Sequence, residues 1–417
     1  MMQLDEHTVS KRRVFYIPGY DPIHPRRYRE LYRKEGADQA DISGYKIELT
    51  PKQGPKSRGG RYGWHVEGMI DGARTEADFE VLVWSDIVKT SMDLNIPQTY
   101  LVLARTAWIY IASGALRRLM WLRKGPVIAA LYPIGMLLLQ LLLAVLVAWF
   151  VGANVAKGIN LLVDWPIVAR LFGWALALPL IAVILRWFRK IDNKLFAYYL
   201  MHDYAYEARS KGENPPELET RMAEFGAEIS EALSSDVDEV LVVGHSSGAH
   251  IGVSVLADLI RAGAVDEDGP ELAFLTLGQV VPMVSFLPRA YRLRADLQYL
   301  SMRDELTWID VTAPGDGCAF ALCDPVAVSG VALENKRWPL VVSAAFSQTL
   351  SPKRWAELRW KFFRLHFQYM CAFDLPGDYD YFQITAGAQT LQARYKDRQP
   401  SKSRIDVAAS AYTSVAP

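Results

Sequence analysis

The segment that most constrains this chain is an apolar run that ends in a serine flanked by glycines. Val240–Val243 is apolar and rich in β-branched residues, which predicts a short buried strand. The following pentapeptide, Gly244–Gly248, fits the pattern G-x-S-x-G, and apolar residues at helical spacing continue from Ala249 to Leu259. In a strand–turn–helix context this pattern exposes its serine, here Ser246, at the end of the strand. The two glycines allow neighbouring backbone to approach that serine closely.

A serine hydroxyl is a weak nucleophile and needs a base within hydrogen-bond reach. Five of the seven histidines precede Ser246 in the chain, and His250 lies one helical turn after it. His366 remains, and it follows the last expected strand, Leu340 to Phe346. We therefore predict that His366 is the base.

The base in turn needs a carboxylate to orient it. Asp316 lies in the turn Ala313–Gly317, just after the expected strand Leu306–Val311, where sites of open α/β sheets lie. Asp324, in the sequence Cys-Asp-Pro, is the alternative acid. Asp316 follows Ser246 by 70 residues and precedes His366 by 50, and each spacing leaves room for a strand–helix unit.

An oxyanion requires backbone N–H donors beside the nucleophile. An early strand beginning at Val14 ends in Pro18-Gly19-Tyr20, so Gly19 and Tyr20 are candidates for one donor. Ser247, directly after the nucleophile, is the candidate for the other donor.

The middle of the chain has a different character. Residues 127–151 contain no charged side chain, and a helix of 25 residues would span about 37 Å, more than the roughly 30 Å of bilayer hydrocarbon. A second apolar segment covers residues 166–187, after an expected loop at 152–165. The sequence therefore predicts a transmembrane hairpin, with the lipid bilayer as a partner.

Basic residues flank both expected spans, whereas the connecting loop has only Lys157. The flanking residues are Arg117, Arg118, Arg123 and Lys124 before the first span and Arg186, Arg189, Lys190 and Lys194 after the second. The positive-inside rule then predicts that both termini and the catalytic part lie in the cytoplasm.

Strands alternating with helices on either side of this hairpin predict an α/β fold with a mainly parallel sheet covered on both faces. Arg61–Ile70 is among the expected strands, and Phe79–Trp84 is expected beside the nucleophile strand. The expected domain ranges are 12–99 and 211–398 for the two parts of the α/β domain, 100–210 for the membrane insertion, and 399–417 for a disordered tail.

Composition excludes several classes of function. Lys and Arg together number 46, as do Asp and Glu, so the balanced charge gives no indication of nucleic-acid binding. The three cysteines do not have the spacing of a metal site and are too few for a disulfide framework, and no dinucleotide fingerprint is present. We therefore expect no metal and no cofactor. The polar N-terminus, Met1 to Arg13, lacks the apolar region of a cleaved secretion signal.

The strand–turn–helix pattern at Ser246, with Asp316 in a later turn and His366 near the end of the chain, resembles the α/β-hydrolase superfamily, in its lipase/esterase-like branch. The resemblance covers roughly residues 12–84 and 216–370. It implies that Ser246 is the nucleophile, His366 the base and Asp316 the orienting acid. It also implies an oxyanion hole formed by the N–H of Ser247 with that of Gly19 or Tyr20. The glycine-run motif of many lipases is missing from the early loop, and the membrane hairpin departs from the usual soluble fold.

These features lead to the hypothesis of a membrane-anchored serine hydrolase that cleaves a carboxylic ester or thioester, lipid-like substrates included. Two alternatives remain open. One is a catalytically silent scaffold or receptor with an α/β-hydrolase fold, and the other is an acyltransferase that uses the same three residues.

Overall fold

The computed structural model describes residues 8–52 and 62–417. Residues 1–7, part of the polar N-terminal segment, and Arg61, expected to begin a strand, lie outside these ranges. The chain divides into two units. The first contains the residues up to Thr90 together with Ile111–Pro126 and Ser210–Pro417, and the second contains Ser91–Tyr110 and Val127–Arg209.

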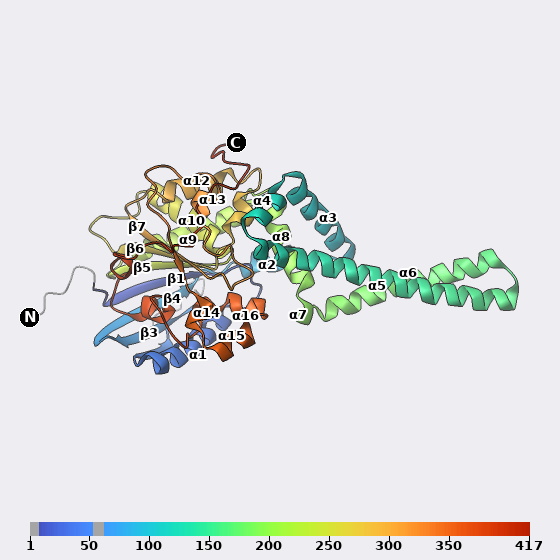
Figure 1. The fold of residues 1–417 in the computed structure, drawn as a ribbon, viewed down its shortest axis with the longest axis horizontal. Coiled ribbons are helices and arrows are strands. Elements are labelled where there is room, and N and C mark those ends of the chain that lie inside the picture. Colours follow the sequence, from blue (N-terminus) through green and yellow to red (C-terminus); the bar gives the residue numbers. More distant parts are fainter. Residues whose placement is uncertain (1–7, 53–61) are drawn as a thin grey trace, which may run out of the picture. The chain divides into compact units, whose positions relative to one another are not determined.

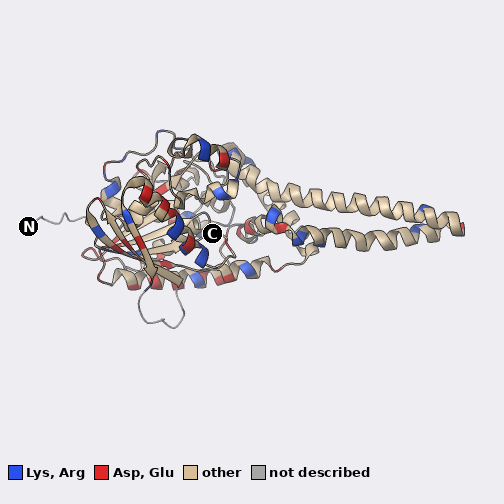
Figure 2. Cartoon of the chain, turned by 90° about the horizontal axis from the view of Figure 1, so that it is seen from below, with Lys and Arg blue, Asp and Glu red and all other residues tan. Residues whose placement is uncertain are grey.

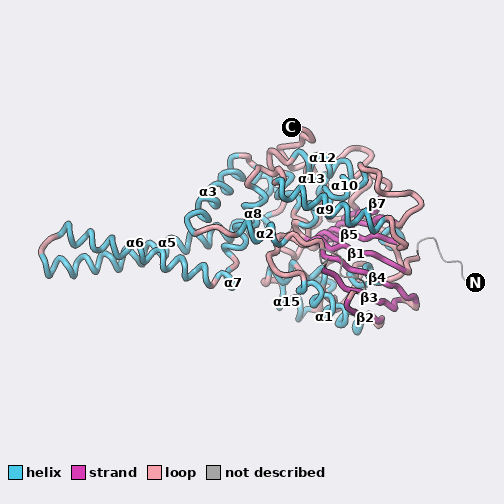
Figure 3. Tube along the Cα trace, turned by 180° about the vertical axis from the view of Figure 1, so that it is seen from behind, coloured by secondary structure: helices cyan, strands magenta, loops and turns pink. Residues whose placement is uncertain are grey.

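The first unit is an α/β structure built on a mixed sheet of eight strands, drawn in magenta in Figure 3. The strands are β1 (Lys11–Ile17), β2 (Lys46–Pro51), β3 (Tyr62–Ile70), β4 (Ala73–Val81), β5 (Glu239–His245), β6 (Glu271–Leu277), β7 (Leu306–Thr312) and β8 (Leu340–Ser343). Their order is β2-β3-β4-β1-β5-β6-β7-β8. The pairings from β4 to β8 are parallel, whereas β3 is antiparallel to both β2 and β4. The expectation of a mainly parallel sheet therefore does not hold at the β2–β4 edge.

The nucleophile strand β5 pairs with β1 on one side and with β6 on the other, so the expectation that Phe79–Trp84 lies beside it is wrong. Val14 of β1 pairs with Leu241 of β5 on one side and with Phe79 of β4 on the other. On the other side of β4, Asp71 and Gly72 both have positive φ and form a tight turn that folds β4 back onto β3.

Helices cover both faces of this sheet. In Figure 1, α9, α10 and α12 lie on one face, and α1, α15 and α16 lie on the other. The helices of this unit are α1 (Arg26–Ser43), α2 (Ser85–Met92), α4 (Ala115–Leu122), α9 (Pro216–Leu233), α10 (Gly248–Arg261), α11 (Val281–Ser285), α12 (Tyr291–Leu300), α13 (Pro325–Val328), α14 (Phe346–Thr349), α15 (Pro352–Leu358), α16 (Phe362–His366), η1 (Gln368–Met370), α17 (Tyr381–Ala386) and α18 (Leu391–Tyr395). The last two residues of α2, Ser91 and Met92, belong to the second unit.

The strand and helix that carry Ser246 form the centre of the core. Val240–Val243 of β5 are fully buried, as their apolar sequence predicts. Burial of such side chains contributes about 1.5–3 kcal/mol each. Gly252 of α10 faces the ring of Phe274 on β6, and a Cβ there would lie 2.7 Å from Phe274 Cε2. The turn at Ser246 is thus held between two tightly packed elements.

Residues 399–417 are ordered by hydrogen bonds, so the prediction of a disordered tail is wrong. Ser401 N–H donates to Val341 O at 2.9 Å, and Ile405 N–H donates to Leu322 O at 2.7 Å. These bonds run between backbone groups, which explains why the polar, unpatterned sequence of the tail gave no signal for them.

The second unit is helical and contains α6 (Pro166–Lys190), α7 (Asp192–Leu195) and α8 (Ala197–Ala208), together with most of α3 (Ile96–Ala112) and α5 (Lys124–Val163). Helices α5 and α6 are long and apolar enough to cross a membrane. The expected loop at 152–165 is wrong, because α5 continues through it and only Asp164 and Trp165 separate the two helices. At 40 residues, α5 is about 60 Å long.

Gly152 lies inside α5, at a close contact with α6. A Cβ on Gly152 would lie 2.7 Å from Gly173 O, and a Cβ on Gly173 would lie 2.6 Å from Gly152 O. Buried small residues continue this seam at four-residue spacing, at Ala144 and Ala148 on α5 and at Ala169 and Ala177 on α6. Small residues let helix backbones approach closely, as in membrane helix pairs.

The outer surface of the two helices is apolar. Figure 2 shows long stretches of α5 and α6 without a charged residue. Large apolar side chains such as Leu146, Leu171 and Trp174 are exposed there. In water this area would be unfavourable, since exposed apolar patches of this extent are rare on soluble proteins.

Candidate active site

The turn after β5 has the conformation that the glycine pattern predicts. Ser246 adopts the left-handed region with φ 57°, which costs a residue other than glycine about 1–3 kcal/mol. Its N–H donates to Leu277 O at 2.9 Å. A Cβ on Gly244 would lie 2.8 Å from Gly248 O, and a Cβ on Gly248 would overlap the carbonyl oxygen of Ile17. Both glycines are therefore needed for the approach of neighbouring backbone.

His366 and Asp316 are in direct contact. His366 ends α16, Asp316 lies in the loop after β7, and both side chains are buried. The distance from His366 Nδ1 to Asp316 Oδ2 is 2.7 Å. This is the hydrogen bond that would fix the imidazole with its other nitrogen, Nε2, available as a base.

Three donors converge on the carboxylate of Asp316. Besides His366, Cys318 N–H donates to Oδ1 at 2.8 Å, and Tyr369 OH donates to Oδ2 at 3.0 Å. Burial by itself raises the pKa of Asp316, but His366 and these hydrogen bonds lower it more, so the net pKa lies below the ordinary value. The carboxylate is thus charged at neutral pH although it is buried.

The alternative acid, Asp324, lies elsewhere and has a different role. Its Oδ1 accepts the N–H groups of Val326 and Ala327, so it caps the N-terminus of α13. Its Oδ2 forms an ion pair with Lys336 Nζ at 2.6 Å. Of the two carboxylates left open by the sequence, the structure brings Asp316 to His366.

His366 lies beside the turn that carries Ser246. Leu277, which accepts the Ser246 N–H, is followed by Gly278, where a Cβ would lie 3.1 Å from His366 Cε1. His245 Nε2 lies 3.0 Å from His366 O, and the two imidazole rings are 4.8 Å apart. In the described part of the chain no hydrogen bond joins Ser246 Oγ to His366. Such bonds are often long without substrate and tighten when it binds.

Gly19 reaches the nucleophile from the end of β1. A Cβ on Gly19 would lie 2.9 Å from Ser246 Cβ and 3.4 Å from Ser246 Oγ. Trp84 holds this loop in place, because its indole N–H donates to Pro18 O at 2.9 Å. Tyr20 instead buries its ring beside Trp84, with ring centroids 6.0 Å apart. Ser247 is buried at the N-cap of α10.

Sequence reasoning missed two residues of this site. Tyr369 lies three residues after His366, and this helical spacing is the signal that could have indicated it. Burial, and next the charge of Asp316, raise the pKa of Tyr369 well above its ordinary value. The phenol therefore stays protonated and can donate its hydrogen bond to Asp316. His245 is the other. Burial, followed by His366, lowers the pKa of His245 to about 3, so this imidazole is neutral.

Arg27 of α1 also lies close to these groups. Its guanidinium carbon is 4.7 Å from the ring centroid of Phe367, the residue after His366. Its Nη1 donates to Asp21 Oδ2 at 2.8 Å, and Tyr28 OH donates to the same oxygen at 2.5 Å. A cation thus lies at the edge of the site, held by a carboxylate from the Gly19 loop.

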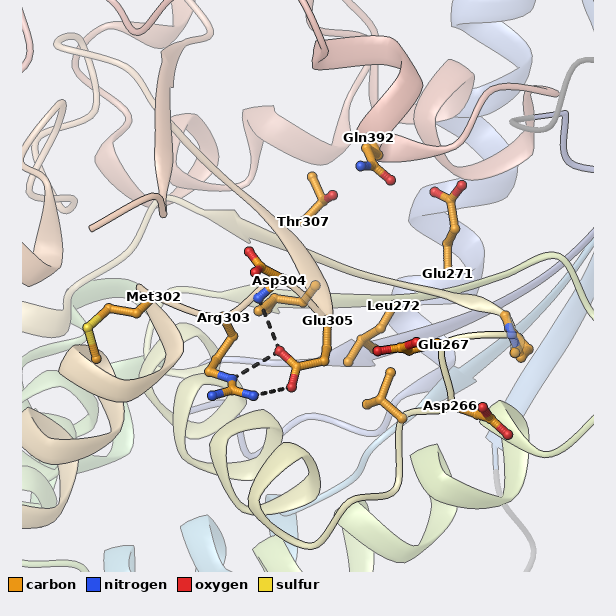
Figure 4. A pocket seen from close by; sticks show the side chains of 14 residues that line it. Asp266, Glu267, Glu271, Leu272, Met302, Arg303, Asp304, Glu305, Thr307 and Gln392 are labelled. Carbon is orange, nitrogen blue, oxygen red and sulfur yellow. Dashed lines mark hydrogen bonds and ion pairs between the residues drawn. The ribbon is translucent and has the colours of Figure 1, made fainter. Parts of the chain in front are cut away.

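The cavity of about 490 Å³ in Figure 4 is a separate feature. Glu271 at the start of β6 and Leu306 at the start of β7 line it, so it lies at the amino ends of these strands. Ser246 and Asp316 follow the carboxyl ends of strands. The described residues that line the cavity include none of the candidate site residues.

Comparison of the chain with protein-family models, with curated proteins and with solved structures found no match in any of the three. The functional argument therefore depends on the geometry of the site.

Proposed function

We propose that this chain is a membrane-anchored serine hydrolase of the α/β-hydrolase type that cleaves carboxylic esters or thioesters. The observation that carries the proposal is the buried hydrogen bond between Asp316 and His366 beside a serine held in the left-handed region. Support also comes from the order of the three residues along the chain, Ser246, Asp316 and His366, which is the order found in α/β-hydrolases. The antiparallel edge of the sheet departs from the mainly parallel sheet expected of this fold.

In the proposed reaction Ser246 Oγ attacks the acyl carbon while His366 Nε2 takes the hydroxyl proton. Asp316 accepts the Nδ1–H and stabilises the imidazolium that forms. The N–H groups of Ser247 and of Gly19 or Tyr20 would stabilise the oxyanion. His366 then gives its proton to the leaving alcohol or thiol, which departs and leaves an acyl-enzyme. Water, deprotonated by His366, attacks the acyl-enzyme, and the acid is released as Ser246 regains its proton.

For the location, we propose that α5 and α6 cross the bilayer as a hairpin and that both termini are cytoplasmic. The exposed apolar surface of the two helices supports the insertion. The basic residues at the outer ends of the spans support the orientation. The proposal includes lipid-like esters among the substrates, which would reach the enzyme from the bilayer that holds its anchor.

A fluorophosphonate probe tests the chemistry, because the serine oxygen displaces fluoride from phosphorus only when a base activates it. The full chain in detergent should be labelled, whereas Ser246→Ala and His366→Ala should not be. His24→Ala is the matched control, since His24 is an exposed histidine of the same unit and should leave labelling unchanged. Equal labelling of wild type and Ser246→Ala would remove Ser246 from the mechanism.

Two other proposals use the same fold and remain distinguishable. An acyltransferase would be labelled by the probe equally well, but it would pass the acyl group of a substrate to an added alcohol faster than to water. A catalytically silent scaffold or receptor would not be labelled at all.

A further inference from the structure

A third potential ligand lies beside the Asp316–His366 pair. One oxygen of Asp316, one nitrogen of His366 and the sulfur of Cys318 all lie within 4.8 Å of one another. It is the one group of three or more such side chains at this spacing in residues 8–52 and 62–417. Spacing along the chain did not indicate it, because His366 is 48 residues after Cys318.

The loop that carries Cys318 is held firmly. Asp316 N–H donates to Ala313 O at 2.9 Å, which closes a tight turn after β7. Cys318 N–H donates to Asp316 Oδ1 at 2.8 Å. A Cβ on Gly317 would lie 3.1 Å from Phe362 Cδ1, so the loop packs against the first residue of α16. Since His366 ends the same short helix, the elements that bear the three side chains are fixed relative to one another.

A thiolate, an imidazole and a carboxylate are together a ligand set for zinc. In tetrahedral zinc sites the ligand atoms are about 3.3–3.8 Å apart, given bonds of about 2.0–2.3 Å. The present separations extend from 2.7 Å, between His366 Nδ1 and Asp316 Oδ2, up to the 4.8 Å limit of the cluster. Small side-chain rotations would therefore suffice. Tyr369 OH, which donates to Asp316 Oδ2, would orient the carboxylate ligand.

We propose that Asp316, Cys318 and His366 form a site for a zinc-class divalent cation, and that cation binding switches the hydrolase off. The regulatory part of this inference depends on the function proposed above, whereas the metal site does not. Three protein ligands leave one coordination position for water.

The switch follows from the tautomer of His366. Without the cation, the imidazole carries its proton on Nδ1, donates it to Asp316, and leaves Nε2 free to accept the proton of Ser246. A cation on Nδ1 takes the place of that proton, and the neutral ring then keeps its single N–H on Nε2. The ring can no longer act as a base. Cys318 binds as a thiolate, so one proton is released to solvent when the cation binds.

Cobalt absorption tests the site without any assay of activity. We expect Co²⁺ added to the metal-free full chain in detergent to give a thiolate-to-metal band in the near ultraviolet and visible bands of a four-coordinate ion. Cys318→Ser should lack the near-ultraviolet band and bind at least about tenfold more weakly. Cys371→Ser is the matched control and should behave as wild type, because Cys371 is outside the cluster. Absence of the band in wild type, or its persistence in Cys318→Ser, would overturn the site.

Fluorophosphonate labelling tests the switch. Zn²⁺ should block labelling of wild type, EDTA should restore it, and Cys318→Ser should need at least about tenfold more Zn²⁺ for the same inhibition. Equal sensitivity of the two proteins would refute the switch while leaving the hydrolase intact. Metal-free wild type that is not labelled would refute the hydrolase, and the cobalt spectra would then decide on the metal site alone.

Discussion

Replacement of Tyr369 by phenylalanine removes one hydroxyl that joins two parts of the site. This hydroxyl donates to Asp316 Oδ2 and accepts the N–H of Ala313, each at 3.0 Å. A hydrogen bond to a charged group contributes about 1.5–3 kcal/mol, and a neutral one about 0.5–1.5 kcal/mol. Because both bonds are buried, we expect Tyr369→Phe to lower the free energy of unfolding by about 2–4 kcal/mol at pH 7.

The same change should slow the chemistry. The carboxylate of Asp316 loses one of its three hydrogen-bond donors, so the pKa of Asp316 rises and its hydrogen bond to His366 weakens. If about half of the free energy of the hydrogen bond to the charged carboxylate contributes in the transition state, about 0.8–1.5 kcal/mol is lost, and the labelling rate should fall about four- to twelvefold. The rate is measured as the second-order rate constant of fluorophosphonate labelling, and stability by urea unfolding of the full chain in detergent.

Tyr379→Phe is the matched control for this experiment. Tyr379 is equally buried, and its OH donates to Tyr369 O at 2.7 Å, a neutral bond outside the carboxylate network. It should lose about 0.5–1.5 kcal/mol of stability and keep the wild-type labelling rate. If Tyr369→Phe labels at the wild-type rate, or if Tyr379→Phe slows labelling as much, Tyr369 does not position Asp316 for catalysis.

Three further predictions concern other parts of the first unit. Asp316→Asn should slow labelling by about three to four orders of magnitude, because it favours the wrong tautomer of His366, whereas Asp324→Asn keeps its helix cap and should label normally. Gly248→Ala should lower stability by about 1–3 kcal/mol in urea unfolding, because its Cβ would overlap Ile17 O, while Gly226→Ala, whose Cβ meets no atom within 4 Å, should be neutral or stabilising. Burial raises the pKa of Asp310 from 3.8 to about 8, so the folded state favours the protonated carboxyl. The stability that this protonated group contributes is full below about pH 4 and is lost as the pH rises to about 8. Asp310→Asn should therefore reduce the fall of the urea midpoint between about pH 5 and pH 8.

The local parts of the fold could be predicted from the sequence. The strand Val240–Val243, the turn at Ser246 and the helix after it depend on an apolar run, two glycines and helical periodicity. These signals act over a few residues. Long-range pairing carries no such signal, and for that reason the position of β1 between β4 and β5 was not predicted. The continuation of α5 past Gly152 was missed for the same reason, because this glycine allows a close contact with Gly173 on another helix.

The acid could have been chosen from the sequence with one more observation. Asp324 is followed by Pro325, and an aspartate before a proline is the signature of a capped helix start. That signature favours a structural role for Asp324 and leaves Asp316. The contact of Cys318 with the same site could not have been found this way, since it depends on how α16 packs on the loop after β7.

If α5 and α6 cross the bilayer as proposed, the close contact between Gly152 and Gly173 has a consequence for the surrounding lipid. Because a Cβ at Gly152 or Gly173 would overlap the partner helix, sliding that brought a larger residue to this crossing would cause a clash. The apolar segment 166–187 of α6 is about 33 Å long as a helix, against roughly 30 Å of hydrocarbon. This small excess would be absorbed by inclination of the whole pair by about 25°, by thickening of the surrounding lipid, or by both. Lipid thickness would thus act on the pair as one body, and membranes of different thickness would hold it at different angles.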